Sequence, residues 1–147
     1  MAILAVRHSP ASAAIVRQQL TDAVQQAGLT ADQAYDAALI ATELVGNAVL
    51  HGRPLPSGDI TVEWHLSAEG YYIAVTDGGH SAAVAAKEAD SHDVSGRGLM
   101  IVAALSHDWG VINTGTGTKV WAQARLAPKG ASACCTSTNT LRSSCNA

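Results

Sequence analysis

The sequence contains no phenylalanine, few charged residues and no long uninterrupted apolar run. Of its 147 residues, 14% are charged and 48% are hydrophobic, a balance that excludes a disordered chain. Without phenylalanine, the core has to be built from small aliphatic side chains. No apolar run approaches the length that crosses a bilayer, and no cleavable signal follows the first ten residues. We therefore expect a cytoplasmic protein with no membrane contact.

An excess of basic residues is missing as well. The formal net charge is −3 and the sequence pI is near 6.0, which leaves no basic surface for a nucleic-acid footprint. We expect no direct contact with nucleic acid. The length suits one domain with one core.

Cysteine is absent from most of the chain. Cys134, Cys135 and Cys145 all lie in the last part, and their spacing matches neither a zinc pair nor a redox pair. They predict tail thiols in a reducing compartment, with a metal site completed by a distant histidine as the alternative. Residues 128–147 have almost no large apolar groups, so we expect a disordered tail after a domain at 1–127.

What the sequence does contain is a clear succession of helical and strand patterns. Ser9-Pro10 predicts a helix N-cap and first turn, Gly28 ends that helix, and Thr30 with Gln33 predicts a capping box for a second helix. Residues 80–95 lack a period and predict a mobile lid. The remaining elements are a strand at 3–6, a helix at 31–51, strands at 59–66 and 71–76, a buried helix at 99–105, and strands at 107–113 and 118–126. This order predicts an α+β domain with helices on one face of a mixed sheet.

The second helix carries an unusual polar stripe. Glu43, Asn47 and His51 stand at i, i+4 and i+8 on a helix that is otherwise apolar nearly all round. An ordinary solvent-facing stripe explains the pattern as well as a ligand site does when the helix is considered alone. A carboxylate and an amide one turn apart can also orient a water and supply an oxygen ligand to Mg²⁺.

Two glycine-bearing segments favour the ligand interpretation. Asp77 ends an apolar strand and precedes Gly78 and Gly79, so it offers an acceptor that suits an adenine amino group; a plain Asp-Gly turn is the alternative. Residues 96–98, Gly-Arg-Gly, open a helix, where free N–H groups favour phosphate. A lid hinge without a ligand is the alternative there.

Together and in this order, four segments resemble the ATP-binding boxes of the gyrase, heat-shock chaperone, histidine kinase and MutL superfamily, and more narrowly its bacterial anti-sigma serine-kinase branch. Residues 43–52, ELVGNAVLHG, resemble the N box. Residues 77–79 resemble the first glycine box and 95–99 the second. Residues 115–121, GTGTKVW, resemble the last box, preceded by Trp109-Gly110.

This resemblance implies a Bergerat-type fold: a two-layer α/β sandwich whose mixed, mostly antiparallel sheet is covered by helices on one face. It implies ATP and Mg²⁺ as ligands, a sigma factor or its antagonist as partner, and a homodimer by analogy. Glu43 would be the catalytic base that activates a serine hydroxyl of the partner. The other implied roles are Mg²⁺ binding by Asn47, adenine binding by Asp77, Gly79 and Thr118, and phosphate binding by Gly96, Arg97, Gly98 and Leu99.

The chain departs from the family pattern at one position, because Ser81 stands where the first glycine box often has its second glycine. That departure favours the alternative hypothesis of a module that holds ATP or a partner protein without catalysis. A third and weaker hypothesis is a metal-dependent hydrolase using His51, His80 and His92, whose spacing is not typical of zinc helices.

Overall fold

The computed structural model describes residues 1–79 and 97–126, with the backbone alone for residues 97 and 98. The predicted lid at 80–95, including Ser81, His80 and His92, lies outside the described residues. So do Gly96 and the predicted tail with its cysteines.

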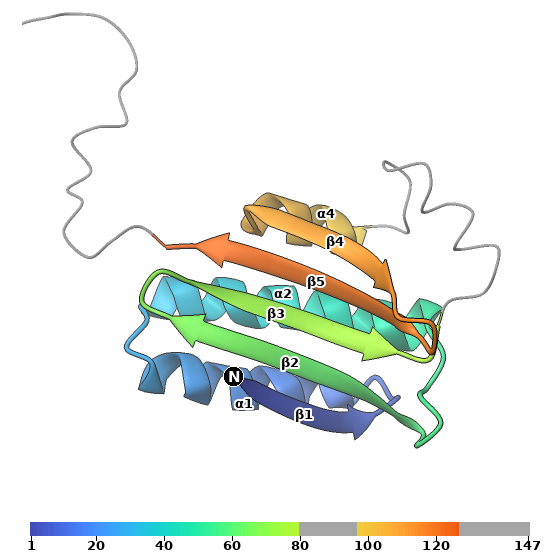
Figure 1. Ribbon diagram of the computed structural model, residues 1–147. Helices are drawn as coiled ribbons and strands as arrows, with labels where there is room; N and C mark the ends of the chain where they lie inside the picture. Colours follow the sequence, from blue (N-terminus) through green and yellow to red (C-terminus); the bar gives the residue numbers. More distant parts are fainter. Residues whose placement is uncertain (80–96, 127–147) are drawn as a thin grey trace, which may run out of the picture.

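Five strands form one sheet in the order β1-β2-β3-β5-β4, and the helices cover one of its faces (Figure 1). This confirms the predicted α+β sandwich, and each of the four strand pairings in the described part of the chain is antiparallel. The elements in chain order are β1 (Ala2–Arg7), α1 (Ser12–Gln26), α2 (Ala31–His51), β2 (Asp59–Ser67), β3 (Gly70–Asp77), α4 (Arg97–Leu105), β4 (Asp108–Asn113) and β5 (Thr118–Arg125).

Alternation along the strands separates a buried face from an open one. In β2, Ile60, Val62 and Trp64 point to the helices and are buried, as the predicted alternation requires. β3 lies between β2 and β5, which confirms the central position predicted from its continuous apolar run. The core is mainly aliphatic, although Trp64 and Tyr71 also belong to it.

The two long helices begin differently. At α2 the predicted capping box is confirmed: the Gln33 N–H donates to the Thr30 hydroxyl oxygen at 3.2 Å, and the Thr30 N–H donates to the Gln33 side chain at 2.8 Å. The predicted Ser9 cap of α1 is wrong. That helix begins at Ser12 without a side-chain cap, because the Ser12 N–H donates to the Ser9 carbonyl in a preceding turn.

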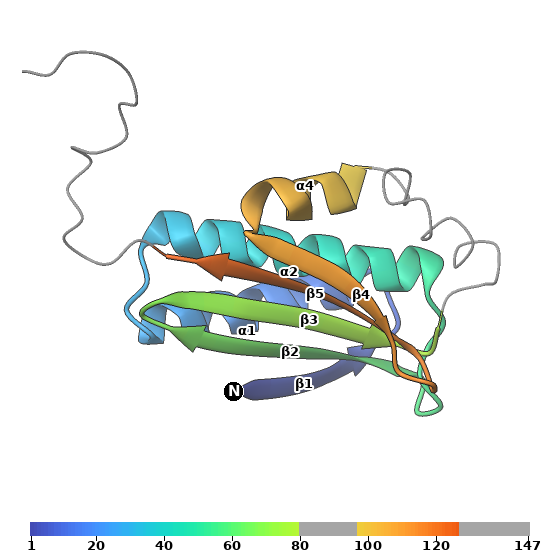
Figure 2. The same ribbon diagram turned by 45° about the horizontal axis from the view of Figure 1, so that its top comes forward.

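The prediction of a buried helix at 99–105 is also wrong in part. Leu99 and Val102 are buried, but Met100 is 72% exposed, and Ala103 and Ala104 are exposed too. α4 lies beside α2, at the β4 edge of the helical layer (Figures 1 and 2), so only one side of this apolar helix meets the core. No helix in the described ranges is long and apolar enough to cross a membrane.

Candidate functional site

The polar stripe of α2 lies between core and solvent. Glu43, Asn47 and His51 are each half-buried, while Leu44 and Ala48, each the next residue along the helix from a member of the stripe, are buried in the core. The stripe is therefore neither fully solvated nor sealed in the core, as a ligand-facing surface should be. Gly46, on the same stretch of helix, has no atom within 4 Å of the position that a Cβ would take, so open space adjoins it.

Asp77 is the most buried acidic residue that the structure describes. Its exposed fraction is 1%, and its Oδ1 accepts the backbone N–H of Gly79 at 2.7 Å. Burial of a carboxylate is unfavourable unless hydrogen-bond donors meet it, and this N–H is one such donor. Gly79 has a φ of +109° and nothing within 4 Å of its Cβ position, so its backbone is open to a ligand.

Thr118 lies beside Asp77 because β3 and β5 are paired there. The two residues are direct partners in the antiparallel register, and Thr118 is 3% exposed. Its hydroxyl donates to the Asn113 side-chain oxygen at 3.4 Å. The structure thus brings together two residues that are 41 positions apart and that the sequence assigned to one adenine site.

Glycines allow the end of α2 to reach this pair. A Cβ at Gly52 would lie 2.5 Å from Cγ of Asp77 and 2.6 Å from the Ala48 carbonyl oxygen, and a Cβ at Gly117 would overlap the Asp77 carbonyl oxygen. Neither position has room for a side chain. α2, β3 and β5 therefore meet at Asp77.

Backbone hydrogen bonds hold this junction in place. The Arg53 N–H donates to the Gly79 carbonyl at 3.0 Å, and the Gly78 N–H donates to the Arg53 carbonyl at 2.6 Å. The segment after α2 is thereby paired with the predicted first glycine box. Gly78 is required here as well, because a Cβ there would overlap the Pro54 carbonyl oxygen.

The predicted phosphate segment lies at the same end of the molecule. α4 begins at Arg97 and packs along α2, with its first turn towards the end of the molecule where α2 ends (Figure 2). Arg97 and Gly98 form that first turn, whose N–H groups have no partner within the helix. The Leu99 side chain is buried in the core, so it anchors α4 and leaves only the Leu99 backbone for the predicted phosphate contact.

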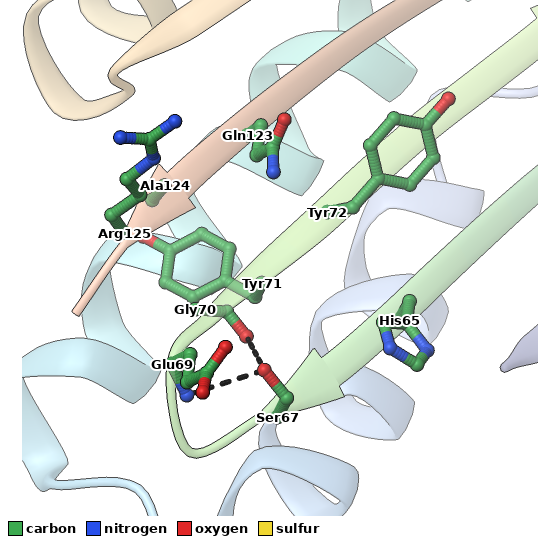
Figure 3. A pocket seen from close by; sticks show the side chains of 9 residues that line it. All are labelled: His65, Ser67, Glu69, Gly70, Tyr71, Tyr72, Gln123, Ala124 and Arg125. Carbon is green, nitrogen blue, oxygen red and sulfur yellow. Dashed lines mark hydrogen bonds between the residues drawn. The ribbon is translucent and has the colours of Figure 1, made fainter.

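A hollow of about 220 Å³ opens elsewhere, on the open face of the sheet at the start of β3 (Figure 3). It is separate from the Asp77 junction, because an eight-residue strand spans roughly 23 Å from its first to its last residue. Gly70 pairs with Ser67 and Arg125, and a Cβ there would overlap the Ala124 carbonyl oxygen, so glycine lets β5 approach closely at this edge of the hollow. The sequence analysis missed this feature. The lining residues are His65, Ser67, Glu69, Gly70, Tyr71, Tyr72, Gln123, Ala124 and Arg125.

The open face of the sheet also carries a group of charged and titratable side chains. Burial raises the pKa of Tyr72, with Glu63 adding to the shift and Lys119 opposing it. Glu63 and Lys119 form an ion pair at 2.9 Å across the open face. Among the residues that the structure describes, no three histidines, cysteines or acids form a metal cluster, and two of the histidines of the hydrolase hypothesis, His80 and His92, lie outside that part of the chain.

One residue at the junction escaped the sequence analysis altogether. The His8 Nε2 lies 3.0 Å from the Ala48 carbonyl oxygen and 3.1 Å from the Gly52 carbonyl oxygen. His8 follows β1, so its contact with the end of α2 spans 40 and 44 residues. No local pattern in the sequence signals a contact of that range.

Comparison with known proteins places this geometry in a family. Residues 6–124 match the family described as histidine kinase-like ATPase domain. No curated protein sequence matches the chain.

Among the solved structures that match this chain, two illustrate the shared fold. One contains the RsbU and RsbW domains of Rv1364c from Mycobacterium tuberculosis: it is 22% identical with a TM-score of 0.63, and the match covers 85% of this chain and 32% of that one. This chain thus spans about a third of the length of that protein. The other is the SiaB-SiaC complex from Pseudomonas aeruginosa, 13% identical with a TM-score of 0.56, covering 86% of this chain and 90% of that one.

Proposed function

Because this chain belongs to the histidine kinase-like ATPase domain family, which implies ATP binding, we propose that it binds Mg-ATP at the Asp77 junction and phosphorylates a serine of a partner protein. The observation that carries the proposal is the convergence on Asp77. A buried carboxylate stands at the end of β3, in contact with the end of α2 and paired with Thr118. An adenine amino group would donate to that carboxylate, and the open backbone at Gly79 leaves room for the base.

The residues present fit magnesium and a triphosphate. The Asn47 amide oxygen would hold Mg²⁺, which prefers carboxylate and carbonyl oxygens together with phosphate and water. Mg²⁺ would screen the charge on the phosphate oxygens. The first turn of α4, at Arg97 and Gly98, would bind phosphate through its N–H groups and the positive end of the helix dipole, together with Gly96, the residue before it in the sequence.

Glu43 would act as the base in this scheme. It lies one helical turn before Asn47 and is half-buried. Its carboxylate would accept the proton of the partner's serine hydroxyl as the new oxygen–phosphorus bond forms and the bond to the ADP leaving group breaks. Phosphoryl transfer depends mainly on positioning and charge stabilisation, so one base and one metal ligand are a sufficient set.

The proposed partner is a sigma factor or its serine-bearing antagonist, by the resemblance that the four boxes carry. The two structural neighbours support a partner-binding role in general terms, since one was solved in complex with SiaC and the other adjoins an RsbU domain. The cytoplasmic location and the homodimer stay predictions.

A labelling experiment tests the kinase proposal. The protein is incubated with γ-labelled ATP, magnesium and its presumptive antagonist, and label on the antagonist is measured. We expect transfer by the wild type, loss of at least about a hundredfold in Glu43→Gln, and an unchanged ATP affinity by calorimetry. Glu69→Gln is the matched control, because Glu69 is an exposed acid in the turn before β3.

The second candidate is a module that holds ATP or a partner without catalysis. Two exposed apolar side chains favour this second candidate. Leu50 in the last turn of α2 is 79% exposed, and Met100 in the first turn of α4 is 72% exposed. Such side chains suit a docking surface. If the wild type binds ATP but transfers no label, the non-catalytic module is supported over the kinase. If it does not bind ATP, both proposals are refuted.

A further inference from the structure

His8 connects the beginning of the chain to the end of α2. Its Nε2 lies within hydrogen-bond distance of two carbonyl oxygens, those of Ala48 and Gly52. Both are acceptors, so Nε2 has to carry a hydrogen, and the neutral ring is therefore the Nε2–H tautomer. This one N–H is shared between the last turn of α2 and the residue that follows the helix.

The two carbonyls belong to a helix end that needs donors. The last four carbonyl groups of a helix have no N–H partner within it. The chain leaves α2 at Gly52 in an extended conformation, with φ −91° and ψ 170°, so no further helical turn supplies a donor to the Gly52 carbonyl. The Gly52 N–H itself donates to the Ala48 carbonyl at 3.0 Å. His8 thus fixes the orientation of the Gly52 peptide group.

Gly52, which directly follows α2, also lies close to Asp77. A Cβ there would lie 2.5 Å from Cγ of Asp77, so a small rotation of this peptide changes the space for the carboxylate. The next residue, Arg53, exchanges backbone hydrogen bonds with Gly78 and Gly79. A continuous set of contacts therefore runs from the His8 ring through Gly52 to Asp77 and to the Gly78-Gly79 backbone.

We propose that His8 is a positioning residue that sets the adenine selectivity of the site, by holding the Gly52 peptide and, through it, the Asp77 carboxylate. This inference rests on the proposed ATP site. His8 has no role in binding phosphate or in the transfer step. Without its N–H, the Ala48 carbonyl keeps the Gly52 N–H but the Gly52 carbonyl turns to find another donor, and the carboxylate loses the alignment that recognises an amino group.

The experiment measures affinity for ATP and GTP in three variants whose folding is checked by urea unfolding. His8→Leu removes the donor, while His8→Gln keeps an Nε2 that can donate to two carbonyls. We expect His8→Leu to weaken ATP binding about tenfold, which is about 1.4 kcal/mol, and to leave GTP binding unchanged, so that the ATP-to-GTP selectivity falls. His8→Gln should restore the selectivity to within about threefold of wild type.

His107→Leu is the matched control. That ring accepts the backbone N–H of Arg125 at 3.0 Å, at the end of β5, whereas Asp77 pairs with Thr118 at the beginning of β5. It should alter stability and leave the selectivity unchanged. A His8→Leu protein that is less stable but keeps the wild-type selectivity would overturn the inference alone. A wild type that fails to bind ATP would overturn the proposed function and this inference with it.

A measurement on the wild type keeps the inference testable if His8→Leu does not fold. Nitrogen-15 chemical shifts distinguish the ring tautomers, and we expect His8 to carry its hydrogen on Nε2. A ring protonated on Nδ1 alone would contradict the shared donation to Ala48 and Gly52, and the inference would be withdrawn.

Discussion

Gly52→Ala tests the packing on which the whole site depends. The backbone at Gly52 has φ −91°, which alanine adopts without strain, so the substitution acts through its methyl group alone. That methyl carbon would lie 2.5 Å from Cγ of Asp77 and 2.6 Å from the Ala48 carbonyl oxygen. Both distances are far inside van der Waals contact, so either the helix end or the carboxylate has to move.

The expected magnitude follows from that overlap. Adding a methyl group to a tightly packed site destabilises proteins by about 1–3 kcal/mol, and we expect the free energy of unfolding to fall by that amount. Movement of Asp77 should also raise the Kd for ATP at least about tenfold, or about 1.4 kcal/mol.

Gly46→Ala makes the same chemical change six residues earlier, inside α2, and should have the opposite effect on stability. A Cβ at Gly46 meets nothing within 4 Å, and alanine is preferred over glycine in a helix interior by about 0.5–1 kcal/mol. Urea unfolding without nucleotide measures both variants, and calorimetry measures ATP binding by Gly52→Ala. If Gly52→Ala matched the wild type in stability and in ATP affinity, the reasoning about the junction would be refuted.

Two further predictions concern stability alone. Thr30→Ala removes half of the capping box of α2 and should lower the free energy of unfolding by about 1 kcal/mol; a loss below the error of urea unfolding would mean that the box contributes nothing. Burial raises the pKa of Tyr71 from 10.0 to about 12. Because the folded chain then holds this proton more tightly than the unfolded chain, stability falls as pH rises from 10 towards 12. Urea unfolding across that window should show a steeper fall in the wild type than in Tyr71→Phe, and equal slopes would contradict the assignment.

Much of the fold could be predicted because its signals are local. The capping box at Thr30 fixed the beginning of α2, and alternation along β2 identified its buried face. The α1 cap was mispredicted because Ser9-Pro10 is compatible with both a helix start and a turn, and only the packing of Ser12 decides between them. Ser12 is 2% exposed, and its hydroxyl donates to the Arg7 carbonyl at 2.6 Å.

The part of the site that depends on distant contacts could not be predicted in the same way. Periodicity shows that Glu43 and Asn47 share a side of α2, but not what that side faces. The insertion of β5 between β3 and β4 is what places Thr118 beside Asp77, and no pattern within either strand specifies it. The His8 contact was invisible for the same reason.

The geometry of the junction separates two kinds of residue in this site. Gly52, Asp77 and Thr118 are part of the packing between α2, β3 and β5, so we expect changes to them to alter nucleotide binding and stability together. Glu43 is half-buried on the polar stripe, about two and a half helical turns before Gly52. Its replacement should therefore remove catalysis without moving the unfolding curve. A Glu43→Gln protein that lost stability in proportion to activity would show that this acid holds the helix in place and is not the base.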